Sequence, residues 1–222
     1  SFGERPVVYR LTDFKTNEYR NLKGGEIYES EESNPMMGYR GAIRYIKDKD
    51  VFELEINAIK HVLKKYNNLI IMIPFVRTPN ELRKVISILS NYEISISNGH
   101  KIWMMVELPS NVILINQFIN EGINGISIGS NDLTELTLGV DRDNEKLEES
   151  FDERDPSVLW SLERVITAAN KQGITSSICG QAPSFFPDLT ERLVKWGITS
   201  VSVSPDSIDS TRDLVYRIEQ QL

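Results

Sequence analysis

The sequence predicts an α/β fold with parallel strands, arranged as a (β/α)₈ TIM barrel. Short apolar runs alternate with longer segments of helical periodicity, which is the pattern of βαβ units. The apolar runs are continuous, as expected of strands that are buried on both faces of a parallel sheet. Polar residues suited to chemistry follow the carboxyl ends of several runs, and in a barrel these ends meet at one mouth.

In the first half of the chain, prolines bound the predicted strands. Residues 7–10 are expected to form the first strand, residues 36–39 a very short one, and residues 69–73 a buried one. Apolar side chains at helical spacing predict a helix over 51–66. A second helix is expected over 78–89, because a threonine cap, a proline and an acidic residue open it.

The same alternation continues through the second half. Strands are expected at 101–106, 125–128, 176–178 and 200–203. Helices are expected at 109–121, from Pro156 to Gly173, at 187–196 and from Asp209 to the C-terminus.

The count of predicted strands bears on whether the barrel closes. Seven strands, including the short one at 36–39, cannot close an eight-stranded barrel. The 222 residues also fall below the ~250 of a typical barrel. We therefore expect an incomplete barrel whose first β/α unit is missing at the N-terminus, with the strands near Pro6 and Val203 as unpaired edges. No break in composition divides the chain, so residues 1–222 are expected to form one domain.

Composition limits the classes of function. The chain has 25 Lys and Arg against 32 Asp and Glu, and this net charge of −7 disfavours non-specific binding of nucleic acid or of an anionic membrane. No apolar run approaches the ~20 residues of a membrane span. The single cysteine excludes an internal disulfide and fits a reducing compartment, so we expect a cytoplasmic protein.

Five candidates for chemistry follow five different predicted strands. They are Arg10, Glu107, Asp132, Cys179 and Asp206. In an open sheet such residues would be spread along one edge, and only those at the switch point would meet. In a barrel they would converge on one site, so their number favours the barrel.

Glu107 and Asp132 are the predicted metal ligands. Two carboxylates suit Mg²⁺ or Mn²⁺, which take oxygen ligands. Two histidines in the whole chain are too few for a His-based cluster. The alternative is that each acid caps a helix or lies in solvent.

An anionic substrate could be bound by three features. The turn Gly129–Asp132 could present backbone N–H groups to a carboxylate, although an ordinary helix-capping turn would look the same. Arg10 and Arg40 offer planar charged groups that match phosphate or enolate oxygens. The alternative for each arginine is a surface cation.

Cys179 lies between a predicted strand and Gly180. Its thiol could be a nucleophile or a general acid, or an inert core group, as most lone cysteines are. No histidine lies nearby in the sequence to activate it, which favours a role in proton transfer.

Together, the motifs resemble the phosphoenolpyruvate synthase (pyruvate, water dikinase) family over almost the whole chain and in the same order. The motifs are RLTDFK (10–15), NPMMGYRG (34–41), IPFVRT (73–78), ELPSN (107–111), SIGSNDLT (127–134), VDRD (140–143) and ICGQAPS (178–184). Pyruvate, phosphate dikinase and enzyme I of the sugar phosphotransferase system share the barrel, but the segments around Arg10 and Gly25 are closer to the synthase.

The resemblance implies the C-terminal phosphoenolpyruvate- and pyruvate-binding domain of a Mg²⁺-dependent transferase. It implies Mg²⁺ ligation by Glu107 and Asp132, a phosphate contact by Arg10, and acid/base catalysis by Cys179 at the substrate methyl carbon. The substrate-binding residues that it implies are Gly129, Ser130, Asn131 and Asp132, with Arg40 and Arg142 as further arginines. The implied overall reaction converts ATP, pyruvate and water to AMP, phosphoenolpyruvate and phosphate, as in gluconeogenesis.

Two parts of the family pattern are not found in the sequence. These are the phosphohistidine and ATP-grasp segments, so the family implies such domains as partners, and the chain alone is not expected to complete the reaction. A homodimer is a further expectation by analogy. The alternatives are a related barrel of the dikinase or enzyme I type, a lyase or aldolase acting on pyruvate enolate, and a non-catalytic regulatory module.

Overall fold

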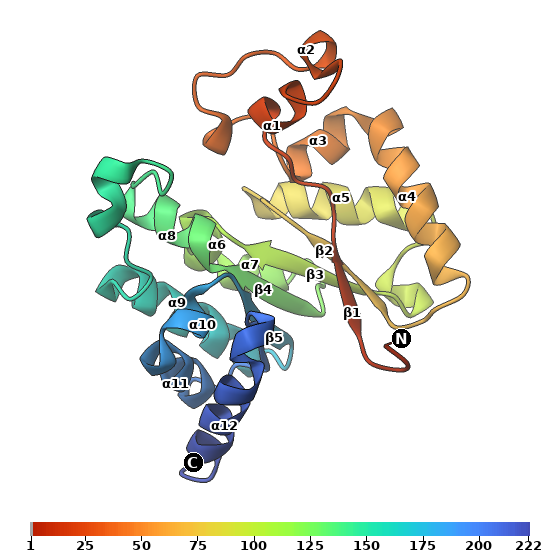
Figure 1. Ribbon diagram of the computed structural model, residues 1–222. Coiled ribbons are helices and arrows are strands. Elements are labelled where there is room, and N and C mark those ends of the chain that lie inside the picture. Colours follow the sequence, from red (N-terminus) through yellow and green to blue (C-terminus); the bar gives the residue numbers. More distant parts are fainter. Residues whose placement is uncertain (1) are drawn as a thin grey trace. The chain divides into compact units, whose positions relative to one another are not determined.

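The computed structural model describes residues 2–222 and divides into two compact units (Figure 1). Unit 1 is Ser1–Trp103 and unit 2 is Met104–Leu222. The boundary falls inside strand β3 (Lys101–Val106). The expectation of a single domain over residues 1–222 stays a prediction.

Unit 1 is built on a parallel strand pair. Strands β1 (Val7–Arg10) and β2 (Leu69–Ile73) pair from Val7 with Leu69 to Arg10 with Met72. The helices of this unit are α1 (Thr16–Arg20), α2 (Gly25–Tyr28), α3 (Ala42–Lys47), α4 (Lys49–Leu63) and α5 (Pro79–Asn91), with 3₁₀ turns η1 (Pro35–Met37) and η2 (Ile96–Asn98).

The two long helices of unit 1 form where the sequence pattern predicts them. Helix α4 buries Phe52, Ile56 and Ile59, which share one helical face. Helix α5 begins with Pro79, and the hydroxyl of Thr78 caps it by accepting a hydrogen bond from the Glu81 N–H. The alternation of strand and helix in this half therefore follows from apolar spacing and capping.

Unit 2 contains the rest of β3 and three further strands. Strand β4 (Gly125–Gly129) pairs in parallel with β5 (Thr175–Cys179), and β5 pairs in parallel with β6 (Ser200–Val201). The helices of this unit are α6 (Pro109–Ile113), α7 (Ile115–Ile119), α8 (Ser130–Leu138), α9 (Pro156–Lys171), α10 (Ala182–Phe185), α11 (Pro187–Lys195) and α12 (Ile208–Glu219), with 3₁₀ turns η3 (Glu145–Ser150) and η4 (Pro205–Ser207). Helices α11 and α12, drawn in blue, pack against each other (Figure 1).

The α/β class with parallel strands is confirmed, but the strand count is wrong. Residues 2–222 contain six strands, not seven, because residues 35–37 form a 3₁₀ turn. Pro35 has a fixed φ and no N–H to donate to a strand ladder, which favours the turn. Closure as a barrel and a missing first unit stay predictions.

Helix prediction fails mainly for short elements. The helix expected over 109–121 is two helices, with Leu114 between them. Four short helices, α1, α2, α3 and α10, have four to six residues each, too few to show a helical period. Within residues 2–222, no helix is both long and apolar enough to cross a lipid bilayer.

Candidate functional site

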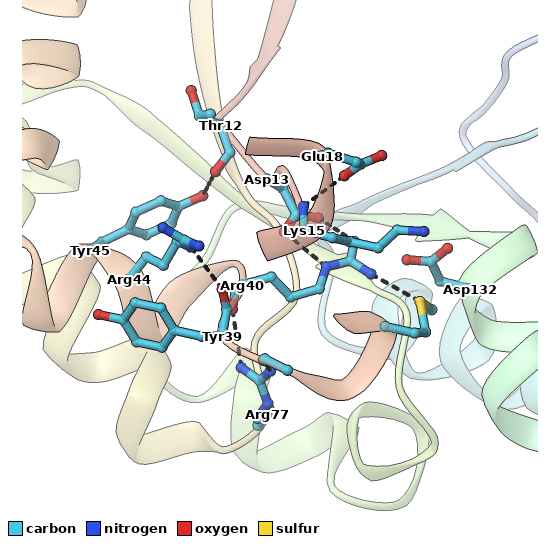
Figure 2. Close-up of polar contacts among 12 residues, drawn as sticks. Thr12, Asp13, Lys15, Glu18, Tyr39, Arg40, Arg44, Tyr45, Arg77 and Asp132 are labelled. Atoms are coloured by element: carbon cyan, nitrogen blue, oxygen red, sulfur yellow. Dashed lines mark hydrogen bonds and ion pairs between the residues drawn. The ribbon is translucent and has the colours of Figure 1, made fainter. Parts of the chain in front are cut away.

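Arg40 lies in a buried polar cluster of unit 1 and is not a surface cation. Its Nη2 and Nε atoms donate to Oδ2 and Oδ1 of Asp13 at 2.6 and 3.1 Å (Figure 2). The guanidinium carbon also lies 3.9 Å from the ring centre of Phe75. These contacts hold one face and one edge of the guanidinium, so its orientation is determined before any ligand binds.

Phe75 is itself held in an unusual conformation. Its φ is 46°, and its side chain is fully buried. Gly41 lies against it with a φ of 65°, and a Cβ on Gly41 would stand 2.5 Å from the Phe75 Cβ. Only glycine fits there, which explains the glycine that follows Arg40 in the NPMMGYRG motif.

Arg77 belongs to the same cluster, although its sequence context did not single it out. Its guanidinium donates to the backbone carbonyl of Arg40 (Figure 2) and to that of Gly38. It also packs over the Phe75 ring. Burial lowers the pKa of Arg77, and the nearby charge of Glu81 opposes that shift. In the sequence, Arg77 is marked only by its place in the IPFVRT motif. Its contacts with Gly38, Arg40 and Phe75 become visible only in the fold.

Two further contacts anchor the loops that carry these arginines. Tyr45 on α3 donates its hydroxyl to the Thr12 carbonyl at 2.7 Å, and Arg44 donates to the Tyr39 carbonyl at 2.7 Å (Figure 2). The RLTDFK and NPMMGYRG motifs are therefore tied to one helix. Arg10 ends β1, as predicted, and is exposed.

In unit 2, Glu107 follows β3 directly and is only 2% exposed. Its N–H donates to Oδ1 of Asn111 at 3.1 Å, which fixes the start of α6. Its side chain lies against the end of β4, because a Cβ on Gly129 would stand 2.7 Å from its Cγ and 2.9 Å from its Oε1. A glycine at position 129 therefore makes room for the Glu107 carboxylate.

Asp132 lies in the first turn of α8, and its side chain is 13% exposed. Nη1 of Arg142 lies 3.7 Å from its Oδ1, and Arg142 also approaches Glu135. The structure thus brings the predicted arginine of the VDRD motif to the predicted metal ligand.

The donor set of unit 2 fits a hard cation. Glu107 and Asp132 offer carboxylate oxygens at the ends of β3 and β4. Within residues 2–222, no cluster of three or more His, Cys, Asp or Glu side chains could hold a metal ion. Mg²⁺ is commonly held by one or two carboxylates and completes its coordination with water and substrate oxygens.

Cys179 ends β5 and lies against the Gly129–Asp132 turn. Its Sγ donates to the Ile128 carbonyl at 3.5 Å, and the Ser130 hydroxyl donates to the Cys179 carbonyl at 3.3 Å. A Cβ on Gly180, which has a φ of 128°, would overlap the Ser130 Oγ. The thiol, half-buried, is therefore fixed beside the predicted substrate-binding turn.

A pocket of about 620 Å³ opens beside this turn. Its lining includes Asn131 and Arg142, both predicted from the sequence, together with Gln181 and Glu153. Burial raises the pKa of Glu153, while Ser130 and Arg142 oppose the rise in part. No signal in the sequence marks Glu153, because it lies in a polar segment without periodicity.

The predicted residues thus fall into one group in each unit. Arg10 and Arg40 belong to unit 1, and the remaining site residues belong to unit 2. Asp206, which follows β6, lies exposed in η4.

Comparisons with known proteins give one consistent family. The model of the family "PEP-utilising enzyme, PEP-binding domain" matches residues 1–220, where PEP is phosphoenolpyruvate. The phosphoenolpyruvate synthase of Aeropyrum pernix is 50% identical over 98% of this chain, and that of Pseudomonas aeruginosa is 50% identical over 95%. The phosphoenolpyruvate synthase of Escherichia coli is 47% identical over 95% of this chain.

The chain spans about a quarter of these relatives, since the match covers 27% of each of the three. Among solved structures, RipC from Yersinia pestis is similar with a TM-score of 0.47 and 15% identity over 70% of this chain and 68% of that one. This likeness is too low to bear on function or on closure of the barrel.

Proposed function

Because the chain belongs to the family of PEP-utilising enzymes through their PEP-binding domain, we propose that it is the C-terminal catalytic domain of a phosphoenolpyruvate synthase. The proposed step transfers a phosphoryl group from a phosphohistidine on another domain to the enolate of pyruvate. One observation carries the proposal: Glu107, Asp132 and Cys179 all lie at the Gly129–Asp132 turn in unit 2.

The first part of the step is formation of the enolate. We propose that Glu107 and Asp132 hold Mg²⁺, which when bound would stabilise negative charge on the enolate oxygen. The backbone of the Gly129–Asp132 turn and Asn131 would bind the pyruvate carboxylate. The Cys179 thiolate would take a proton from the methyl carbon, and the electron pair of the broken C–H bond would form the C=C bond. In the reverse direction the thiol returns that proton.

The arginines would bind the phosphoryl group and the substrate. A guanidinium that is already oriented loses little entropy when it binds an anion, and Arg40 is held in this way by Asp13 and Phe75. We propose that Arg10 and Arg40 bind phosphoryl oxygens and that Arg142 binds substrate beside Asp132.

The partner domains, the oligomeric state and the compartment are proposed from the relatives. Each of the three is about four times as long as the matched segment. We propose that ATP-grasp and phosphohistidine domains supply the phosphoryl group from ATP, and that the enzyme works as a homodimer in the cytoplasm.

Titration of this chain with oxalate, an enolate mimic, tests the site without the other domains. Calorimetry should show oxalate binding that requires Mg²⁺ and that is lost in Asp132→Asn and Glu107→Gln. Asp209→Asn, an exposed acid on α12, is the control and should bind like the unchanged chain. Equal binding of oxalate in the presence of EDTA would contradict the proposal, as would unchanged binding by both variants.

A further inference from the structure

Thr12 lies where the sheet stops holding the segment that leads to Asp13. The Leu11 N–H donates to the Met72 carbonyl at 3.0 Å, at the end of the ladder between β1 and β2. The next ladder donor on the β2 side would be residue 74, two positions beyond Met72. That residue is Pro74, which has no N–H to donate. Beyond Leu11, the path of the backbone therefore depends on contacts other than the ladder.

Side chains from α3 and α4 bind all three polar groups of Thr12. Its N–H and its hydroxyl each donate to Oε1 of Glu55 on α4 at 2.9 Å. Its carbonyl accepts the hydroxyl proton of Tyr45 on α3 at 2.7 Å (Figure 2). Tyr9 on β1 donates to the same Glu55 oxygen at 2.8 Å. Hydrogen bonds to an ionised acceptor are about twice as strong as those between neutral groups, so Glu55 is the stronger of the two anchors.

These contacts fix two successive peptide planes. The Thr12 N–H belongs to the planar peptide before it, and the Thr12 carbonyl belongs to the peptide that joins it to Asp13. When both planes are held, the φ and ψ angles of Thr12 are set, and so is the point from which the Asp13 side chain departs. Asp13 in turn accepts the two hydrogen bonds that orient Arg40 (Figure 2).

We propose that Glu55 is a positioning residue that places the Arg40 guanidinium by fixing Thr12 and, through it, Asp13. The inference rests on the proposed function, in which Arg40 binds phosphoryl oxygens. Without Glu55, the N–H and hydroxyl of Thr12 lose this acceptor, and the Tyr45 contact holds one of the two peptide planes. A displacement of about 1 Å at a group that positions substrate can cost about 100-fold in rate.

Hydrogen exchange at the Arg40 Nε–H, followed by NMR, tests the link without any ligand. This proton is donated to Asp13, so its exchange is slow only while Asp13 stays in place. Glu55→Met fills a similar volume without a carboxylate and should speed the exchange at least tenfold. Glu55→Gln keeps an acceptor oxygen and should stay within threefold of the unchanged chain. Glu53→Met makes the same change at an exposed acid of the same helix and is the control, which should have no effect.

The Leu11 amide separates positioning from a general loss of stability. Its hydrogen bond to Met72 belongs to the ladder, so its exchange in Glu55→Met should stay within twofold of that in the unchanged chain. Equal acceleration at Leu11 and at Arg40 would mean that Glu55 only stabilises unit 1, and it would overturn the inference. An unchanged rate at Arg40 in a folded Glu55→Met variant would do the same.

Calorimetry with two ligands connects the link to the proposed reaction. Phosphoenolpyruvate carries the phosphoryl group that Arg40 is proposed to bind, whereas oxalate carries none. With Mg²⁺ present, Glu55→Met should bind phosphoenolpyruvate at least tenfold more weakly and oxalate within twofold of the unchanged chain, and Glu55→Gln should restore the lost affinity. An equal loss for both ligands would also overturn the inference. If the unchanged chain binds neither ligand, the proposed function fails, while the exchange rates still decide whether Glu55 positions Arg40.

Discussion

Arg40 and Asp13 form a bidentate ion pair, and their side chains are 5% and 0% exposed. Removing one charge from such a pair leaves the other buried without compensation. Asp13→Asn is therefore expected to lower the free energy of unfolding by about 3–5 kcal/mol, measured by urea denaturation. Asp209→Asn, which breaks an exposed pair with Arg212, should change it little. Similar losses in the two variants would contradict this assignment.

Gly129 is expected to control metal binding through Glu107. Its φ of −85° suits any residue, so Gly129→Ala introduces little backbone strain. The new Cβ would instead stand 2.7 Å from the Glu107 Cγ, and the carboxylate must move. Mg²⁺-dependent oxalate binding should fall at least tenfold, measured by calorimetry.

Gly139→Ala is the matched control for this substitution. Gly139 has a φ of 66°, and a Cβ added there would meet nothing within 4 Å, so the change strains the backbone by about 1–2 kcal/mol and leaves the site untouched. Oxalate should bind this variant normally. Normal binding by Gly129→Ala would show that Glu107 is not a ligand.

Sequence reasoning succeeds where the signal is local. Helix α5 is predicted because Thr78 and Pro79 mark its first turn, and the apolar run of β2 marks a strand buried on both faces. It fails where the deciding contact is distant in sequence. Glu153 is buried and lines a pocket with Asn131 and Gln181, which lie more than 20 residues away, and nothing in its own segment shows that. Arg77 is separated in the same way from the Gly38 carbonyl that it binds.

Cys179 is expected to be required for exchange of pyruvate methyl protons. In D₂O with Mg²⁺, this chain should catalyse incorporation of deuterium into pyruvate, followed by NMR, since the proposed enolate forms without phosphoryl transfer. Cys179→Ala should lower the rate at least 100-fold, within the range that acid/base groups contribute. Mg²⁺-dependent oxalate binding should persist. A variant that exchanges at the original rate would show that another group takes the proton.

The stability of the chain should depend on pH through Glu153. Burial raises its pKa in the folded state above the value of 4.5 that applies when it is exposed, and the charge of Asp152 adds to the rise. Between these two pKa values the folded state binds more protons than the unfolded state, so stability falls as pH rises. The glutamine in Glu153→Gln does not titrate, so this variant should not lose stability in this way as pH rises.

The measurement is urea denaturation of both chains from pH 4 to pH 8. The unchanged chain should lose stability relative to Glu153→Gln as pH rises from about 4.5, and the difference should level off above the folded pKa. Asp155 should affect stability with the opposite pH dependence. Hydrogen bonds from Ser157 lower its pKa in the folded state. Its contribution to stability is therefore present above the unfolded pKa and is lost as pH falls. Asp155→Asn should therefore remove stability at neutral pH and little at low pH. A difference between Glu153→Gln and the unchanged chain that is constant across this range would mean that Glu153 keeps an ordinary pKa.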